Sequence, residues 1–230
     1  MSTAVYIISA PSGSGKSTLV NELRKIVSGL DFSVSYTTRK PRGSEQNGRE
    51  YFFVPREDFD EMLKRGEFLE SADVFGNCYG TARRFLDDAR ERGRDLLLDI
   101  DVQGAAQIKK KIPDAVSIFI LPPDRKTLET RLRRRGLDND EVIDRRLSDA
   151  RKEIENYRNY DYILVNDRLE ESIDELKDIV LAERCRRSRT DPSPEELETI
   201  KKADRCRLKN MAERVRPILA SFALAIPLGH

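Results

Sequence analysis

The sequence has 230 residues, 42 of them Lys or Arg and 41 Asp or Glu, which gives a formal net charge of +1 at pH 7. This length suits one α/β domain with an inserted lobe better than two very small domains. The near-zero charge argues against a global electrostatic attraction to nucleic acid or to an anionic membrane, so we expect neither as a partner.

The three cysteines, Cys78, Cys185 and Cys206, lie far apart and show no C-x-x-C spacing. We therefore expect neither a disulfide framework nor a zinc site. No stretch of the sequence has the apolar length of a signal peptide or a membrane span. Together these features predict a soluble, cytoplasmic chain.

Four apolar runs predict buried β-strands. The first, VYIIS at residues 5–9, leads into a glycine-rich loop, and apolar residues at helical spacing follow it. The others are LLLDI at 96–100, AVSIFIL at 115–121 and YILV at 162–165, each followed by a helix-like segment. Continuous apolar strands alternating with helices predict an α/β fold of the P-loop NTPase type, a parallel sheet with helices on both faces.

Two segments interrupt this alternation. Residues 32–83 are rich in Ser, Thr, Arg, Gly and aromatic residues, which predicts an inserted mixed α/β lobe. Residues 124–157 contain two arginine-rich helices joined by a turn with Gly136, which predicts a helical lid. We thus predict one domain over residues 1–185, with its core formed by 1–31, 84–123 and 158–185.

Residues 186–230 form a predicted C-terminal helical extension. A helix is expected to begin near Ser193 and Pro194 and to stop at Pro217. The apolar residues expected to pack this extension against the domain are Leu197, Ile200, Leu208 and Met211. The run RPILASFALAIPL at 216–228 exposes apolar side chains unless something covers them, so a homo-oligomer formed through this extension is one hypothesis.

The segment SAPSGSGKST at residues 9–18 nearly matches the phosphate-binding loop G-x-x-x-x-G-K-[ST], with Ala10 in place of the first glycine. In such a loop the backbone N–H groups cradle phosphate oxygens, Lys16 reaches the outer phosphates and the Ser17 hydroxyl binds Mg²⁺. A methyl group at the strand exit is tolerated if the backbone needs no positive φ there. The alternative is a plain glycine-rich turn. The predicted ATP-binding residues of the loop are Ala10, Pro11, Ser12, Gly13, Ser14, Gly15, Lys16, Ser17 and Thr18.

A second anion site is indicated by SYTTRKPRGSEQNGREYFFV at residues 35–54, where Arg39 and Arg42 flank Pro41. A solvated loop is the alternative. Here the sequence resembles the guanylate kinases, whose signature Thr-Thr-Arg-x-Pro-Arg is intact at residues 37–42. Further blocks match that family in the same order over about residues 5–183: NGREYFFV at 47–54, EFLESADVFGNCYGT at 67–81, LLLDIDVQG at 96–104, RRRG at 133–136 and VND at 165–167.

The resemblance implies an ATP:GMP phosphotransferase that uses Mg²⁺, with ATP and GMP as its small-molecule substrates. The residues it implies for the GMP phosphate are Arg39, Arg42, Tyr51 and Tyr79. Those it implies for guanine are Ser35, Glu70, Thr81 and Asp101, and Asn166 and Asp167 match the region beside the donor adenine. The chemistry of guanine agrees, because its N1–H and N2 amino group are adjacent donors and a carboxylate such as Glu70 accepts from both.

Phosphoryl transfer needs positioned reactants and compensation of negative charge. The acceptor phosphate, with a second pKa of about 6, is largely dianionic at neutral pH, so no general base is required; the only histidine is His230. Helical geometry places Arg131 and Arg135 beside the stripe of Leu128 and Leu132, and Arg146 beside the stripe of Ile143 and Leu147. The predicted catalytic residues are Lys16, Arg39, Arg135 and Arg146, Arg131 is a further ATP contact, and Arg133, Arg134 and Arg145 are expected at the surface.

Asp99 and Asp101 lie at the end of the strand LLLDID, at the carboxyl edge of the predicted sheet, where open α/β folds bind ligands; Asp99 has two possible roles. It either steadies Mg²⁺ through water or caps the next helix, and both readings remain open. For the whole chain, the alternatives are a non-catalytic binding module of guanylate kinase fold and a kinase of a phosphorylated sugar. A nucleic-acid-remodelling ATPase is weaker, because no series of strand-binding aromatic residues is evident.

Overall fold

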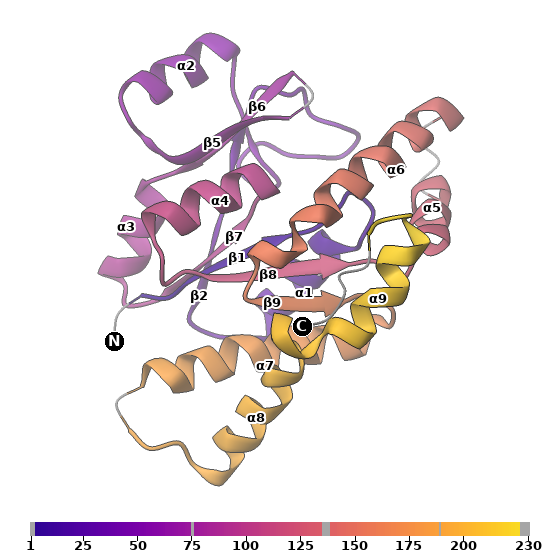
Figure 1. Cartoon of the computed structure of the whole chain (residues 1–230). Coiled ribbons are helices and arrows are strands. Elements are labelled where there is room, and N and C mark those ends of the chain that lie inside the picture. Colours follow the sequence, from indigo (N-terminus) through magenta and orange to yellow (C-terminus); the bar gives the residue numbers. More distant parts are fainter. Residues whose placement is uncertain (1–2, 75, 135–138, 189, 226–230) are drawn as a thin grey trace. The chain divides into compact units, whose positions relative to one another are not determined.

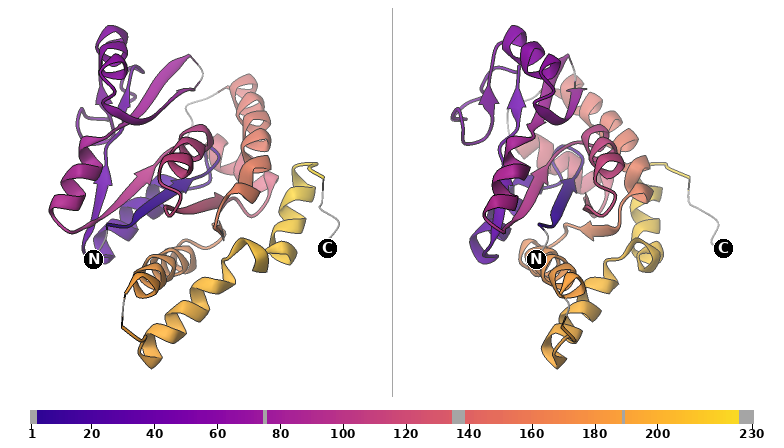
Figure 2. Two further views of the ribbon diagram at one scale, coloured as in Figure 1. Left: turned by 60° about the vertical axis from the view of Figure 1, so that its left-hand side comes forward. Right: turned by 90° about the vertical axis from the view of Figure 1, so that its left-hand side faces the viewer.

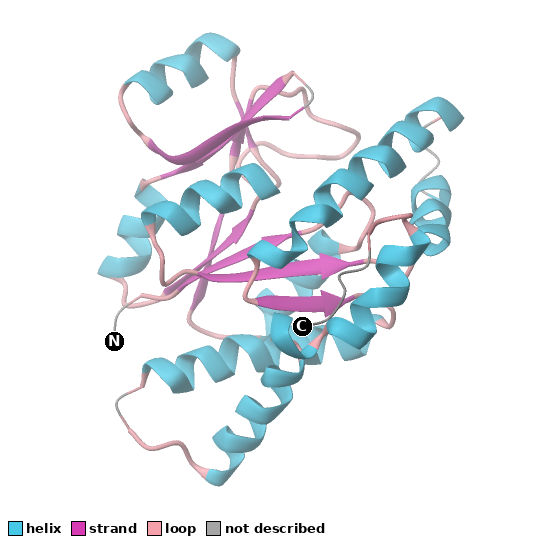
Figure 3. Cartoon of the chain, viewed as in Figure 1, coloured by secondary structure: helices cyan, strands magenta, loops and turns pink. Residues whose placement is uncertain are grey.

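A computed structural model describes residues 3–74, 76–134, 139–188 and 190–225 (Figure 1). Its larger sheet has five strands in the order β2-β7-β1-β8-β9, and the paired strands β2–β7 and β8–β9 are parallel. The strands are β1 (Val5–Ser9), β2 (Leu30–Ser33), β7 (Asp95–Asp99), β8 (Val116–Leu121) and β9 (Tyr162–Val165). Helices alternate with these strands along the chain (Figure 3), so the predicted α/β class with a parallel sheet is confirmed.

The chain divides into two compact units. One comprises residues 1–7 and 28–116, and the other comprises residues 8–27 and 117–230. The domain, lobe and lid boundaries that we expected from the sequence remain predictions.

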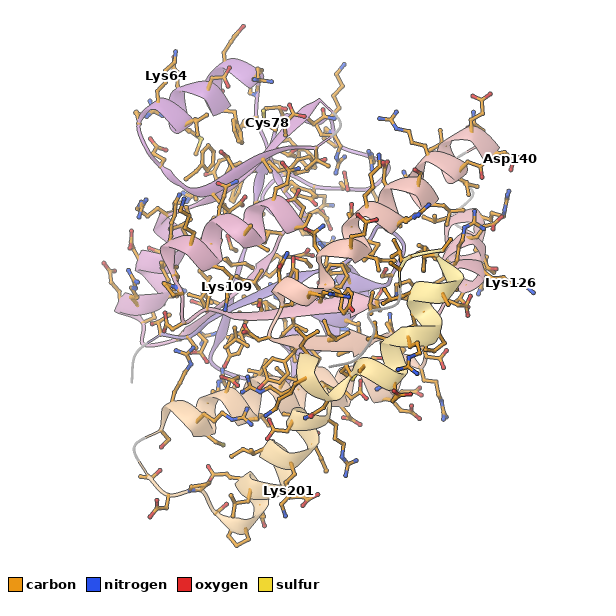
Figure 4. All side chains as sticks on the ribbon, in the orientation of Figure 1. Lys64, Cys78, Lys109, Lys126, Asp140 and Lys201 are labelled. Carbon is orange, nitrogen blue, oxygen red and sulfur yellow. The ribbon has the colours of Figure 1, made fainter. Side chains whose placement is uncertain are left out.

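The first unit contains a second sheet built from residues of the predicted lobe. Its order is β4-β3-β6-β5, and β5 pairs with β6 in antiparallel register. The strands are β3 (Tyr36–Thr37), β4 (Phe52–Phe53), β5 (Phe68–Val74) and β6 (Asn77–Ala82), and the helices of this unit are α2 (Arg56–Lys64), α3 (Arg84–Glu91) and α4 (Val102–Lys111). Phe59 of α2 stacks on Phe68 of β5 and forms a small core with Cys78, which Figure 4 labels. The lobe therefore has its own apolar support.

The second unit carries the glycine-rich loop and the two arginine-rich helices. All six residues of β8 and all four of β9 are buried, as expected for parallel strands covered on both faces. The helices here are α1 (Lys16–Ile26), α5 (Arg125–Arg134), α6 (Asp140–Ile154) and α7 (Leu169–Arg187), and a 3₁₀ turn, η1 (Glu155–Asn159), follows α6. The predicted stripe of α6 is buried: Ile143, Leu147, Ala150 and Ile154.

The C-terminal extension differs from the prediction of one helix ending at Pro217. It forms α8 (Pro194–Arg205), a 3₁₀ turn η2 (Leu208–Asn210) and α9 (Ala212–Ser221), which continues through Pro217. Ser193 caps α8 in a reciprocal capping box with Glu196, so the predicted start is correct. Both views of Figure 2 show α8 beside α7 in a helical hairpin.

Packing explains why α9 tolerates an internal proline. Proline removes one helical hydrogen bond and normally ends a helix. Here Val215, Ile218, Leu219 and Phe222 follow helical spacing, and each is only 2–3% exposed. Their burial compensates for the lost bond, so the chain breaks instead at residues 206–211, where Tyr162 of β9 forms an isolated antiparallel bridge with Arg207.

The packing of the extension bears on two predictions: that its apolar residues pack against the domain, and that it forms a surface for self-association. Met211 is buried, whereas Leu197 is 45% exposed and does not pack as predicted. Ile218, Leu219 and Phe222 of the run at 216–228 are covered within the chain, so these three side chains offer no surface for self-association, which stays a hypothesis. Residues 226–228 lie outside the described residues. Among the described helices, none combines the length and apolar character needed to cross a membrane.

Candidate functional site

The glycine-rich loop joins the end of β1 to the start of α1, as predicted. Gly13 and Gly15 have φ values of 93° and 88°, a backbone region that suits glycine. A Cβ atom on Gly13 would lie 2.9 Å from side-chain atoms of Leu128 and Leu132 of α5, and one on Gly15 would overlap the amide nitrogen of Asn166. The loop thus needs glycine at both positions for conformation and for space.

Ala10 lies directly after β1 and does not need glycine. Among the described non-glycine residues, only Ala223 has a positive φ. The condition under which a methyl group is tolerated at the strand exit is therefore met. The first backbone hydrogen bond of the loop follows at Ser14, whose N–H donates to the Pro11 carbonyl at 3.1 Å.

Asn166, which follows β9, supports this loop. It is 5% exposed, and its side-chain amide donates to the Ser14 carbonyl at 2.7 Å. The backbone carbonyl of Asn166 accepts a hydrogen bond of 2.9 Å from Nη2 of Arg131. Asp167 is exposed. The structure thus brings Asn166 and Arg131 together beneath the loop, a contact that the sequence motif did not reveal.

The guanidinium of Arg131 has one hydrogen-bond donor without a partner among the described residues. Burial lowers the pKa of its guanidinium, and its Nη1 is buried without a hydrogen-bond partner among the described residues. An unpaired buried donor on a cation is costly unless an anion joins it. This orphaned donor fits an anionic ligand of the loop.

The other arginines of α5 and α6 agree with helical geometry where they are described. Arg146 is half-buried, whereas Arg145 is exposed, and Arg133 pairs at the surface with Glu129 and Asp140. Arg134 is also exposed. Arg135 lies outside the described residues, so its predicted role remains a prediction.

The predicted second anion site is assembled in the first unit. Arg39 is 8% exposed, its Nε donates to the Tyr79 hydroxyl at 3.2 Å, and its guanidinium lies 5.3 Å from the centre of the Tyr51 ring. Tyr51 and Tyr79 meet edge to face with ring centres 5.8 Å apart. Arg42 is exposed nearby in the chain. The structure thus brings together Arg39, Tyr51 and Tyr79, three of the four residues expected to hold a phosphate.

The sequence reasoning missed Glu45, which binds Arg39 through both carboxylate oxygens at 2.9 and 3.0 Å. The Arg42 N–H also donates to Glu45 at 2.7 Å. Burial raises the pKa of the Glu45 carboxyl, but these hydrogen bonds outweigh it and hold the pKa below its usual range. A phosphate bound by Arg39 must therefore share the guanidinium with Glu45 or displace it.

The two threonines of the Thr-Thr-Arg signature have structural partners. The Thr37 hydroxyl donates to the Cys78 carbonyl at 3.0 Å and accepts from the Arg39 N–H at 3.2 Å. The Thr38 hydroxyl accepts from the Cys78 N–H at 2.9 Å. They lock the loop carrying Arg39 to β6, which explains why threonine suits both positions.

The predicted guanine site centres on Glu70 of β5, which is 3% exposed. One of its oxygens accepts a hydrogen bond of 2.6 Å from the buried Thr81 hydroxyl. A Cβ on Gly104 would lie 2.5 Å from the other oxygen, so this carboxylate lies against the first turn of α4. Asp101 caps α4 by accepting from the Gly104 N–H at 2.8 Å. Ser35, before β3, is 8% exposed.

Burial raises the pKa of Glu70 to about 7, the Asp101 carboxylate adds to this, and the Thr81 hydrogen bond only partly opposes it. Near neutral pH, Glu70 is thus divided between its ionised and neutral forms. A carboxyl whose pKa is raised by burial and by a second carboxylate marks a candidate functional site. The ionised form would be stabilised by a ligand with two adjacent donors.

Metal binding would depend on few protein ligands. Among the described residues, no group of three or more His, Cys, Asp or Glu could hold a metal ion. Ser17, in the first turn of α1, offers an exposed hydroxyl oxygen, and Asp99, at the end of β7, offers a half-buried carboxylate. Oxygen donors in small number suit Mg²⁺, which keeps several waters and binds substrate phosphates.

Comparisons with known proteins show which family the chain resembles over most of its length. The family model described as guanylate kinase matches residues 2–183. A guanylate kinase of Koribacter versatilis is 64% identical over 225 residues, covering 96% of this chain and 97% of the relative, and so includes most of the extension. The guanylate kinase of Escherichia coli K12 is 50% identical over 187 residues, covering 80% and 90%. The crystal structure of the Anaplasma phagocytophilum guanylate kinase aligns with a TM-score of 0.66 at 37% identity, covering 79% of this chain and 86% of that one.

Proposed function

The chain belongs to the guanylate kinase family, enzymes that transfer the γ-phosphoryl group of ATP to GMP, and we propose how its residues carry out this reaction. The products are ADP and GDP. The roles assigned below to individual residues are our proposal.

The observation that carries the proposal is the buried carboxylate of Glu70. Guanine offers N1–H and the N2 amino group as adjacent donors, whereas adenine offers no such pair. Glu70 would accept from both while Thr81 holds its other lone pairs, as the 2.6 Å hydrogen bond between them supports. Ser35 and Asp101 would complete the guanine site. A phosphorylated sugar would leave this buried carboxylate unused.

Arg39, Tyr51, Tyr79 and Arg42 would hold the GMP phosphate. The side chains of Arg39 and Tyr79 already form a hydrogen bond of 3.2 Å, which fixes the guanidinium beside the phenol. Charge-assisted bonds from arginine are the strongest that a phosphate receives from side chains. Because the GMP phosphate is already ionised, Arg39 would orient it for attack rather than activate it.

The loop of residues 10–18 would hold the ATP phosphates. Its N–H groups and the N-terminus of α1 favour anions, and Lys16 would reach the outer phosphates. Arg131, with a buried unpaired Nη1, would add a cation beside the loop. Asn166 would hold the loop in shape through Ser14 and, with Asp167, border the adenine.

Arg135 and Arg146 would stabilise the negative charge that develops on the transferring phosphoryl group. Mg²⁺, when bound, would neutralise charge on the ATP phosphates. Ser17 would hold it directly and Asp99 would steady it through water. The second reading of Asp99, as a helix cap, is not favoured, since Asp101 is the residue that caps α4. We further propose a cytoplasmic setting, in which the free thiols of Cys78, Cys185 and Cys206 stay reduced.

The test of this function is ADP formation from ATP and Mg²⁺ with GMP, AMP, CMP or UMP as acceptor. We expect kcat/KM for GMP to exceed that for each other nucleotide by on the order of 10³, and EDTA to abolish turnover. GMP binding without turnover would indicate a binding module instead. Turnover with a phosphorylated sugar but none with GMP would indicate a kinase of a phosphorylated sugar.

Gly104→Ala is expected to raise KM for GMP by roughly tenfold with little net change in thermal stability, because the cost of displacing the buried Glu70 carboxylate offsets the gain in helix propensity. Gly104 is helical, so alanine favours the fold by about 0.5–1 kcal/mol through helix propensity, but its Cβ would lie 2.5 Å from the Glu70 carboxylate. Steady-state kinetics and thermal melting would test this, with Lys110→Ala on the exposed face of α4 as the control. An unchanged KM would show that the carboxylate position does not matter for GMP.

A further inference from the structure

Strand β5, which carries Glu70, lies at the edge of the four-stranded sheet. The outward backbone groups of an edge strand have no strand partner and need another one. Helix α4 lies along this edge (Figure 1), and three of its side chains bind the backbone of β5. The pairs are Gln103 with the Asp73 carbonyl, Gln107 with Ser71, and Lys111 with the Leu69 carbonyl. We call these three side chains the α4 ladder.

The α4 ladder has a regular geometry. Its members are four residues apart on the helix, a rise of about 6 Å, and their partners are two residues apart on the strand, about 6.7 Å. The two spacings nearly match, so the helix can follow the strand over three contacts. Figure 4 labels Lys109, which lies on another face of α4 and donates instead to the Ala115 carbonyl at 2.8 Å.

Gln107 makes the central and most complete contact. Its Nε2 donates to the Ser71 carbonyl at 2.7 Å, and its Oε1 accepts from the Ser71 N–H at 3.2 Å. A side-chain amide thus satisfies both backbone groups of Ser71, as a neighbouring strand would. Ser71 is the residue directly after Glu70, so this contact fixes the peptide bond that follows Glu70.

The opposite side of Glu70 is less regular. The pairing of β5 with β6 shifts register between Phe68 and Glu70. Such a bulge disrupts the ladder of backbone hydrogen bonds and re-aims the neighbouring side chain. The α4 ladder therefore supplies support on the helix side at the point where β6 supplies less.

We propose that Gln107 is a positioning residue that holds Glu70 for guanine, and that it thereby contributes to the preference of the enzyme for GMP. This inference rests on the proposed role of Glu70 in binding guanine. One helix then fixes the site in two ways: Gln107 holds the backbone beside Glu70, and Gly104 lies against the Glu70 carboxylate. Small displacements of such supporting contacts loosen a site that must match its ligand closely.

The test compares Gln107→Leu, which removes both hydrogen bonds at similar side-chain size, with Gln107→Lys, whose ammonium can still donate to the Ser71 carbonyl. For Gln107→Leu we expect KM for GMP to rise about tenfold, because a less precisely held Glu70 carboxylate binds the two guanine donors less well. We expect kcat at saturating GMP and KM for ATP to change less than twofold, and the ratio of kcat/KM for GMP to that for AMP to fall. Gln107→Lys should lie between Gln107→Leu and the wild type. Lys110→Leu on the exposed face of α4 is the control.

A lower melting temperature with unchanged KM for GMP would overturn the inference, because Gln107 would then be merely structural. An equal loss with GMP and AMP would also overturn it. If Gln107→Leu does not fold, Gln107→Lys decides by the same criteria. Failure of the proposed function is distinct, since the wild type itself would then show no preference for GMP.

Discussion

Replacing Lys16 with alanine is expected to lower kcat by on the order of 10³, the largest effect of any single change in the loop. Removing one donor that stabilises developing charge costs about 10²–10³ in kcat, and the Lys16 ammonium carries a full charge. KM for GMP should change less than threefold, because none of the proposed GMP contacts involves Lys16. The measurement is steady-state ADP formation at saturating ATP and GMP.

Lys25→Ala provides the matched control for this variant. Lys25 lies on the same helix and is paired at the surface with Glu22 at 2.7 Å, a contact of little energetic weight. Lys25→Ala should retain the activity of the wild type. If Lys16→Ala retained more than a tenth of the wild-type kcat, the loop would not provide the principal charge stabilisation. The presence of Ala10 in place of the first glycine would then matter little for activity.

The fold was predictable where strands are continuous apolar runs. VYIIS and YILV coincide with β1 and β9. The predicted run at 96–100 is shifted by one residue from β7, and the run at 115–121 begins one residue before β8. The strand β2 was missed. Its sequence LDFS alternates polar and apolar residues over only four positions, and it pairs in parallel with β7, more than sixty residues away along the chain. Short strands of this kind depend on distant partners.

The C-terminal extension shows the same limit for helices. Ser193 followed by Pro194 is a local signal, and it predicted the start of α8, which the structure completes with a capping box from Glu196. The helix end depends on tertiary contacts instead. The chain breaks near the bridge between Arg207 and Tyr162, while α9 passes Pro217 because its apolar face is buried.

For the site, the sequence identified residue types through motifs, and the structure assembled most of them. Arg39 lies beside Tyr51 and Tyr79, and Glu70 beside Thr81, while the roles of these residues stay predictions. The supporting contacts were not predictable. Glu45 lies only six residues from Arg39, but nothing in its spacing distinguishes it from a surface glutamate. Asn166 and Ser14 are 152 residues apart, and no local pattern reports such a pairing.

Replacing Glu70 with glutamine is expected to lower kcat/KM for GMP by on the order of 10²–10³. The amide offers one acceptor and one donor group, so its N–H would face a guanine donor, and buried mismatches of this kind are strongly rejected. The loss should appear mainly in KM, because Glu70 does not touch the transferring phosphoryl group in the proposed arrangement. Steady-state kinetics with GMP and AMP measures both the loss and the fall in discrimination.

The pH dependence of kcat/KM for GMP should also change in the Glu70→Gln variant. Because the pKa of Glu70 is raised to about 7, kcat/KM of the wild type for GMP should fall about tenfold per pH unit below that value, since a neutral carboxyl cannot accept both guanine donors. Glu70→Gln should lose this dependence and retain only that of the GMP phosphate, whose second pKa is about 6. A wild-type profile that is flat between pH 8 and pH 6.5 would contradict the assignment.

The folding stability of the free enzyme should fall as the pH rises, whereas kcat/KM for GMP should rise. The pKa of Glu70 rises from 4.5 to about 7 on folding, so its stabilising contribution is full below pH 4.5 and is lost as the pH rises through 7. At pH 8 the ionised, buried carboxylate therefore destabilises the free enzyme, by about 3 kcal/mol for this difference in pKa. Glu70→Gln cannot ionise, so it should unfold at higher urea concentration than the wild type at pH 8, and the gap should shrink toward pH 5. Glu67→Gln changes a half-buried carboxylate that lies three residues before Glu70 and pairs with Arg65, and it should show neither effect. If Glu70→Gln were instead less stable at pH 8, the carboxylate would be a structural element that guanine merely borders.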